Sequence, residues 1–524
     1  MNATPLEQKR RRDNNRPLRW SVYMLMIAVA LGSSTARIFM QYDKEQPHPF
    51  KSSNDKSRWA TVRALVENKT YEIDEIIADK DWDTIDKVQH KNRHGVDAFY
   101  SSKPPILATM AAGIYWPIYH YDELKGWVTG DKSKDADGNH TTEENSAANA
   151  DASTISAATD AAENGHRFRF EDYPYDVSAI ILIFTNLIPW FVFLVAVAKF
   201  ADRYGTSTWG RMFVVATAAF GTYLSTFSIV LNNHLPAAAS AAIAIYATCR
   251  IWIDGQTKLR YFFLAGLFAA FTAAFELPGL ALLGVLGLLC LIRAPGRTLL
   301  VGLPAAALVV GGFFASNYAA HDTWRPPYMH RTMDLEDPDN WYNFEGSYWA
   351  NPERLQKDGA EKRSPQIAKE FDAGESDMRT YVFHATIGHH GVFSLTPIWG
   401  LSLLGFLIML FSGTGRRRLL ALLLLAVAGV VLSFWLFYLP GEARNYGGHS
   451  AGFRHAHWLI PIFLVFLLPA ADLFNKSRVL RFVALLLLIA SVFAVTYNAN
   501  NPWTHPWLVD SMVQTGYLPA DAVK

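Results

Sequence analysis

The sequence predicts an all-α polytopic membrane protein with about 11 transmembrane helices. Of its 524 residues, 51% are hydrophobic and only 18% are charged. A mean hydropathy of +0.07 would suit a soluble enzyme, but the apolar residues are concentrated in long runs separated by polar segments. The short connections between these runs alternate between basic and non-basic, as expected when a chain crosses a membrane repeatedly.

Composition excludes several other classes. The 48 Lys and Arg residues nearly balance the 47 Asp and Glu residues, which leaves a formal net charge of +1. This balance argues against nucleic-acid binding through bulk positive charge. The high apolar content argues against a disordered chain. The two cysteines, Cys249 and Cys290, lie inside apolar runs, so the sequence contains no disulfide framework.

The first transmembrane helix is expected at residues 21–40, after a basic cytoplasmic segment at 1–20. No small-residue cleavage site follows the apolar run, so it is interpreted as a retained helix rather than a signal peptide. The basic flank is expected to keep the N-terminus in the cytoplasm.

Ten further runs are expected to span the membrane, as helices 2–7 within 177–318 and helices 8–11 within 391–498. They are 177–198, 210–231, 235–253, 260–275, 277–293, 298–318, 391–412, 418–438, 457–474 and 478–498. Glu276, followed by Pro278 and Gly279, favours a tight turn between two of the shorter runs.

The apolar segment 106–119 is expected not to span, because it has only 14 residues and follows Pro104-Pro105. With this choice the basic connections all face the cytoplasm, and the C-terminus lies outside. The extracytoplasmic segments are then 41–176, 319–390, 439–456 and the tail 499–524. Within the first of these, 129–166 is expected to be a disordered insertion, because it has almost no residues that could pack.

The first outer loop contains a predicted juxtamembrane helix in which Trp59, Val62 and Val66 form one apolar face. Asp55 lies at its start, where a carboxylate is either a helix cap or a functional group. Further along, Lys103 precedes Pro104-Pro105, which places it at the membrane surface. It is there either a snorkelling side chain or a ligand for a lipid phosphate.

Two motifs in this loop resemble the GT-C glycosyltransferases, in particular the lipid A aminoarabinose transferases and the protein O-mannosyltransferases. The first is Asp-x-x-Arg-aromatic-Ala, beginning at Asp55, and the second is aromatic-x-x-Lys-Pro-Pro-Ile, beginning at Tyr100. The resemblance is clear over about residues 20–200 and only architectural beyond. One departure is Lys56, where the family has a second carboxylate.

The resemblance implies a GT-C-like bundle and an inverting transfer of sugar from a polyprenyl-phosphate donor to an acceptor hydroxyl on the extracytoplasmic face. It implies that Asp55 is the general base and that Lys103 binds the donor phosphate. The residue types suit this chemistry, which needs one base and cations for the departing phosphate. The acceptor would be a lipid, a glycan or a protein, and the location is expected to be a bacterial inner membrane.

Other residues on the same face are candidates for the site. Arg325, Arg444 and Arg454 are either further phosphate ligands or interfacial anchors, and Arg58 and Tyr100 are candidate substrate contacts. His389 and His390 are also candidates, and a divalent metal is possible, although their spacing fits no specific zinc motif. The Asp-x-Asp patterns at 81–83 and 337–339 are interpreted as turn residues.

Two alternatives belong to other functional classes. A transporter or flippase of a polar lipid would be expected to show inverted repeats and polar or broken helices at mid-membrane. Here the predicted spans are mostly free of charge, and the polar residues lie outside them. A non-catalytic membrane scaffold would use the outer loops to bind a partner.

Overall fold

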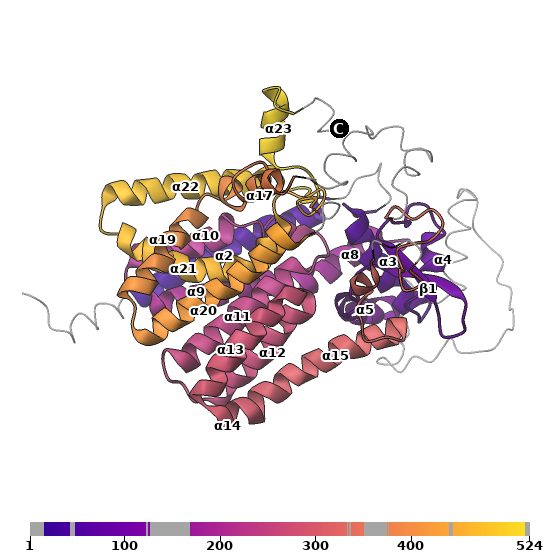
Figure 1. Cartoon of the computed structure of the whole chain (residues 1–524), viewed down its shortest axis with the longest axis horizontal. Helices are drawn as coiled ribbons and strands as arrows, with labels where there is room; N and C mark the ends of the chain where they lie inside the picture. Colours follow the sequence, from indigo (N-terminus) through magenta and orange to yellow (C-terminus); the bar gives the residue numbers. More distant parts are fainter. Residues whose placement is uncertain are drawn as a thin grey trace, which may run out of the picture.

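The computed structural model describes residues 15–41, 48–121, 124–125, 168–332, 334, 337–349, 375, 377–439 and 444–518. The predicted insertion 129–166 and most of the basic segment 1–20 lie outside these residues. Helices dominate the described chain and gather into one bundle, with a smaller loop unit at one end (Figure 1).

The bundle is built from long apolar helices. They are α2 (Arg16–Phe39), α9 (Ile188–Tyr204), α10 (Thr208–Phe220), α11 (His234–Trp252), α12 (Leu259–Phe275), α13 (Leu280–Arg293), α15 (Leu303–His321), α19 (Trp399–Ser412), α20 (Gly415–Ser433), α21 (Ile460–Phe474) and α22 (Arg478–Tyr497). Seven helical stretches in the described residues are long and apolar enough to cross a membrane, and four shorter apolar helices accompany them. The chain is therefore an integral membrane protein.

Two apolar cores hold the bundle together. One joins α2, α9, α10, α19 and α21, and the other joins α11, α12, α13, α20 and α21. Small side chains allow close helix approach. At Gly405 on α19, an added Cβ would lie 1.7 Å from the backbone oxygen of Phe466 on α21. Such close backbone contacts are typical of helices that pack within a membrane.

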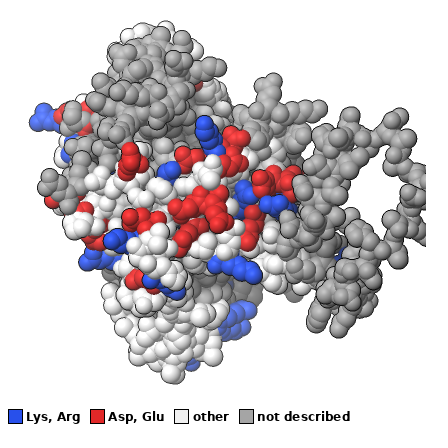
Figure 2. All heavy atoms as spheres, turned by 90° about the vertical axis from the view of Figure 1, so that its right-hand side faces the viewer, with Lys and Arg blue, Asp and Glu red and all other residues white. Residues whose placement is uncertain are grey.

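The loop unit comprises residues 48–119. It contains α3 (Ser53–Glu67), α4 (Asp74–Ile77), β1 (Lys87–Lys91), β2 (Asp97–Ser101) and α5 (Ile106–Tyr119). The two strands form an antiparallel hairpin in which Lys87 pairs with Ser101. A third core joins this unit to the bundle through α8 (Pro174–Leu182) and residues 223–231. Charged side chains gather at this end of the molecule, whereas part of the bundle below is mainly uncharged (Figure 2).

Helix α3 forms as the sequence predicts, but its apolar face does not lie open for a membrane. Trp59, Val62 and Val66 are at most 4% exposed and pack in the core of the loop unit. The helix cap is Ser52, whose side chain accepts a hydrogen bond from the backbone N–H of Asp55 at 3.1 Å. The interpretation of Asp55 as the cap is therefore wrong, because the cap lies three residues earlier.

The predicted span 210–231 is only partly helical. Helix α10 ends at Phe220, and the chain continues through turns to a short 3-10 helix at Phe227–Ile229. Hydroxyl side chains in this stretch bond to backbone carbonyls, as Thr226 does to Val495 at 2.7 Å. Such side chains compete with regular helix formation. The irregular stretch is buried and brings Leu231 to the loop unit.

The remaining helices outside the loop unit are short. They are α14 (Pro295–Arg297), α17 (Met378–Thr386), α18 (Val392–Leu395) and α23 (Trp507–Gln514), with 3-10 helices η3 (Leu277–Gly279), η5 (Pro327–His330) and η10 (Arg454–Leu459). The described part of the chain also contains five-residue π-helical segments at Ile183–Leu187, Thr298–Gly302 and Phe434–Tyr438.

The orientation in the membrane stays a prediction from the basic connections. Reporter tags placed after Gly415 and within 129–166 are expected to lie on opposite sides of the membrane. Protection from a membrane-impermeant reagent would measure this. The tag after Gly415 is expected on the cytoplasmic side and the tag within 129–166 on the outer side. Both tags follow 106–119 in the chain, so if the two sides are exchanged, residues 106–119 span the membrane and the assignment of faces is wrong.

Candidate active site at the junction of the loop unit and the bundle

Lys103 lies between the hairpin and α5. Its backbone N–H donates to Ser101 Oγ at 3.2 Å, and Pro105 is the N-cap residue of α5. The ammonium donates to Asp86 Oδ1 at 3.0 Å. Burial lowers the pKa of Lys103 to about 8; Asp86 opposes this shift, and the charges of Arg58 and Arg454 add to it. Lys103 is therefore a half-buried cation with two other cations nearby.

Arg58 comes from α3 and is held by two asparagines. Its guanidinium donates to Asn54 Oδ1 one turn earlier and to Asn233 Oδ1 of the bundle at 2.7 Å. The side chain is buried, which lowers the pKa of Arg58 to about 10, and the carboxylates of Asp55 and Asp86 oppose the shift. The orientation of this guanidinium thus depends on both the loop unit and the bundle.

Arg454 reaches the same place from the start of η10. Its Nε donates to the carbonyl of Gly447 at 2.7 Å, and its guanidinium lies 5.0 Å from the centre of the Trp503 ring. Gly447 has a φ of 96°, and an added Cβ would lie 3.0 Å from Arg454 Cγ. A glycine is therefore needed there. We call Arg58, Lys103 and Arg454 the cation cluster.

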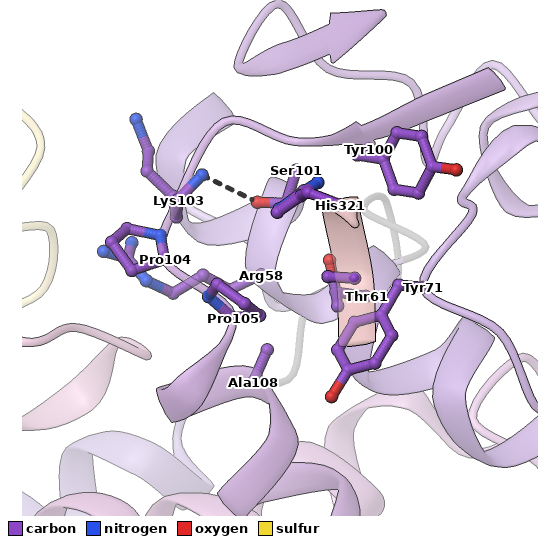
Figure 3. Close-up of a pocket in the computed structure, with 11 residues that line it drawn as sticks. Arg58, Thr61, Tyr71, Tyr100, Ser101, Lys103, Pro104, Pro105, Ala108 and His321 are labelled. Atoms are coloured by element: carbon purple, nitrogen blue, oxygen red, sulfur yellow. Dashed lines mark hydrogen bonds between the residues drawn. The ribbon is translucent and has the colours of Figure 1, made fainter. Parts of the chain in front are cut away.

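A small pocket, partly open to solvent, lies against Arg58 and Lys103 of this cluster. It is lined by Arg58, Thr61, Tyr71, Tyr100, Ser101, Lys103, Pro104, Pro105, Ala108, Ala320 and His321. In Figure 3 the charged ends of Lys103 and Arg58 point to one side of the view, and the rings of Tyr71 and Tyr100 lie on the other. We call it the tyrosine pocket. Cations and aromatic rings thus meet in one small space.

Aromatic stacking fixes one wall of the tyrosine pocket. Tyr100 stacks on His90 with ring centres 4.2 Å apart, and His90 Nε2 is 3.0 Å from His321 Nδ1 at the end of α15. Tyr71 Oη hydrogen-bonds with Thr109 Oγ1 at 2.9 Å. The sequence-predicted substrate contact Tyr100 is therefore held rigidly beside Lys103.

Asp55 lies on α3, one turn before Arg58, and is buried. Its carboxylate accepts backbone N–H groups from Lys51 at 3.3 Å and from Leu231 at 3.2 Å. Burial raises the pKa of Asp55 to about 7, while these bonds and the charge of Arg58 oppose the shift. The described residues that line the tyrosine pocket do not include Asp55. The carboxylate therefore adjoins the cation cluster through Arg58.

Two of the predicted phosphate ligands lie with other partners. Arg325 is exposed and pairs with Asp339 at 3.2 Å, and Arg444 donates to the carbonyl of Leu439 at 3.0 Å. Neither is among the charges that shift the pKa of Lys103. Of the predicted cations, the structure brings together Lys103, Arg58 and Arg454.

His389 and His390 belong to a separate cluster of imidazoles. His384 stacks on His389 at 3.9 Å, and His390 stacks on Tyr446 at 5.2 Å. Burial and neighbouring imidazoles lower the pKa of His389 to about 3. Within the described ranges, no group of three or more His, Cys, Asp or Glu residues is arranged to hold a metal ion.

The two Asp-x-Asp patterns occur in turns, where carboxylates accept hydrogen bonds from nearby backbone N–H groups. Asp79 Oδ1 accepts the N–H of Asp81, and Asp83 pairs with Lys87 at 2.5 Å. In the second pattern, Asp337 Oδ1 accepts the N–H of Asp339 at 2.9 Å. These contacts agree with the interpretation as turn residues.

Sequence reasoning missed two carboxylates of the site. Asp86 is the partner of Lys103, and Glu276 accepts from Asn233, which binds Arg58. Asp86 carries no motif, because it is one of several acidic residues in a polar stretch. Glu276 was interpreted as a turn residue, although a carboxylate between two apolar helices is itself a sign of function.

Comparison with known proteins gives distant similarities. No protein-family model matches the chain, and no curated protein is similar enough to match. Among solved structures, the archaeal oligosaccharyltransferase AglB from Archaeoglobus fulgidus, in complex with an inhibitory peptide and a dolichol-phosphate, is 12% identical with a TM-score of 0.41. The same enzyme tethered with an acceptor peptide is 12% identical with a TM-score of 0.44. Each match covers 95% of this chain and 58% of the other, so the chain spans little more than half of these neighbours' length.

Proposed function

We propose that the protein is a GT-C-type membrane glycosyltransferase that uses a polyprenyl-phosphate-linked sugar. The observation that carries this proposal is the cation cluster: one buried cation, Arg58, and two half-buried cations, Lys103 and Arg454, come from separate segments and lie beside a pocket with aromatic walls. Their mutual repulsion must be offset. Asp86 offsets part of it, and Asp55 and Glu276 add only partial negative charge near pH 7, because burial raises their pKa values to about 7 and about 8. A bound phosphate would supply the remaining negative charge through charge-assisted hydrogen bonds.

The surroundings of the cluster suit a lipid-linked sugar. Helix α5, which starts directly after Lys103, exposes apolar side chains such as Met110 and Trp116 that could contact an isoprenoid chain. The tyrosine pocket offers rings and hydroxyl groups for a sugar. A phosphate bound at Lys103 would have its lipid on one side and its sugar on the other.

The reaction we propose is a direct displacement. The acceptor hydroxyl gives its proton to Asp55, the acceptor oxygen bonds to the anomeric carbon, and the bond from that carbon to the phosphate oxygen breaks. Configuration is therefore inverted. The polyprenyl phosphate leaves with one more negative charge, which the cation cluster stabilises. A carboxylate has about four lone-pair positions, and the two backbone donors on Asp55 leave capacity for the acceptor hydroxyl.

Transfer should follow a narrow bell-shaped pH profile. Asp55 must be ionised to act as a base, so kcat/KM should fall as the pH drops below about 7. Lys103 must be protonated to hold the phosphate, so kcat/KM should fall again above about 8. Lys103→Arg should remove the alkaline limb, because arginine stays charged. A kcat/KM that stays constant from well below pH 7 to well above pH 8 would contradict the assigned roles.

Native mass spectrometry tests the proposed donor class. The purified protein, incubated with synthetic polyprenyl phosphate or with a nucleotide sugar, should retain the first and not the second. Retention of a nucleotide sugar alone would overturn the proposal. A transporter or a scaffold could also bind a lipid phosphate, but neither would break the bond between sugar and phosphate.

A further inference from the structure

A largely buried carboxylate that is linked to Arg58 through Asn233 has no part in the reaction described above. Glu276 follows α12 directly and precedes the Pro278-Gly279 turn into α13. Its side chain is only 12% exposed, although both neighbouring helices are apolar. An ionisable group in such a place is costly and is usually retained for function.

Glu276 is connected to Arg58 through one asparagine. Glu276 Oε1 accepts from Asn233 Nδ2 at 2.8 Å, and Asn233 Oδ1 accepts from Arg58 Nη2 at 2.7 Å. The amide of Asn233 can make both contacts in only one orientation, because its two ends differ. Asn233 Nδ2 also donates to the backbone carbonyl of Phe275 at 3.1 Å, so the carboxylate and this carbonyl together determine which end of Asn233 faces Arg58.

His234, the residue that follows Asn233, also contacts the Glu276 carboxylate. His234 Nδ1 lies 2.5 Å from Glu276 Oε1 at the start of α11. The neighbouring Asn232 binds only local backbone, including the carbonyl of Phe227 at 2.7 Å. The adjacent asparagines thus have different roles: Asn232 shapes the turn, and Asn233 bridges to the site.

Electrostatic interactions also link Glu276 to Arg58. Arg58 and Arg454 are both close enough to Glu276 to lower its pKa, against burial, which raises it to about 8. Arg58 and Arg454 repel one another when no anion lies between them.

We propose that Glu276 is a positioning residue, which acts through Asn233 to hold the Arg58 guanidinium ready for the donor phosphate. The identity of the ligand as a donor phosphate rests on the proposed function, whereas the position of the Arg58 side chain can be measured without any substrate. Replacement of Glu276 should therefore release Arg58 even in protein that has never met a substrate.

The test measures how fast phenylglyoxal modifies Arg58 in the full-length purified protein, by peptide mass spectrometry. Glu276→Ala should make Arg58 react several-fold faster. Glu276→Gln should leave it close to the wild-type rate, because glutamine keeps an acceptor oxygen for Asn233. Arg63 is the matched control, since it lies on the same helix but is held by Glu67 at 2.8 Å and Glu171 at 2.6 Å.

Each outcome decides the proposal. Unchanged Arg58 reactivity in folded Glu276→Ala would overturn it. Equal acceleration at Arg58 and Arg63 would also overturn it, because Glu276 would then support the whole loop unit. If Arg58 alone responds, the proposal holds, and transfer should fall about 10-fold in Glu276→Ala and be largely kept in Glu276→Gln. If Glu276→Ala accelerates modification of Arg58 alone but the wild-type protein transfers no sugar, the positioning role stands and only the proposed function is refuted.

Discussion

Lys103→Met should lower the rate of sugar transfer by roughly 10²-fold and weaken binding of the lipid donor. Methionine keeps most of the apolar stem but removes the charge that faces the phosphate. The loss should be larger in kcat than in binding, because the phosphate gains negative charge as the sugar leaves. Initial rates over a range of donor concentrations would separate the two effects.

Lys87→Met is the matched control for this substitution. Lys87 lies in the same hairpin and pairs with Asp83 at 2.5 Å, but it does not line the tyrosine pocket. It should leave transfer nearly unchanged. Lys103→Met also leaves the Asp86 carboxylate without its ammonium partner, which could lower stability. The double variant Lys103→Met with Asp86→Asn removes this unpaired charge and shows whether it caused any loss of stability. Normal donor binding by folded Lys103→Met would refute the role of Lys103.

Asp55→Asn should reduce turnover by roughly 10²–10⁴-fold, because asparagine cannot take the acceptor proton at neutral pH. The contacts of Asp55 indicate that Asp55→Asn should also lower the stability of the fold. Asp55 accepts N–H groups with both oxygens, whereas asparagine has one oxygen and would turn its NH₂ group towards a donor. Loss of one such buried bond costs about 1–3 kcal/mol. Turnover must therefore be measured at a temperature where the variant remains folded.

Ser52→Ala separates chemistry from helix capping. It removes the side chain that caps α3 but leaves the carboxylate of Asp55 in place. We expect a loss of about 0.5–2 kcal/mol in stability with nearly normal turnover per folded molecule. If Asp55→Asn behaves like Ser52→Ala in both measurements, Asp55 is a structural residue and another group is the base.

The sequence predicted the helices well where an apolar run alone determines them. Helix α5 and the bundle helices α2, α11, α20 and α22 follow the predicted runs closely. The prediction failed at 210–231, because hydropathy does not register the hydroxyl side chains that end α10 early. It also placed the apolar face of α3 against a membrane, since periodicity shows an apolar face but not what covers it.

The residues of the candidate site could be predicted only where neighbouring residues in the sequence form a recognisable motif. Lys103 and Arg58 stand in motifs, and Arg454 stands among glycines. Asp86 and Glu276 act through partners that are 17 and 43 residues away, and no local pattern reveals such pairs. Arg325 looked equivalent to Arg454 in sequence, but the fold turns it towards Asp339 at the surface.

Sugar transfer from a purified lipid donor is the most direct test of the central claim. The purified protein would receive synthetic polyprenyl-phosphate sugars with a labelled sugar, together with membranes that supply lipid, glycan and protein acceptors. We expect label to move to an acceptor while free polyprenyl phosphate is released, and we expect Lys103→Met to lose this activity while Lys87→Met keeps it. Transfer from a nucleotide sugar without any lipid phosphate would contradict the account, as would intact lipid donors after long incubation with folded protein.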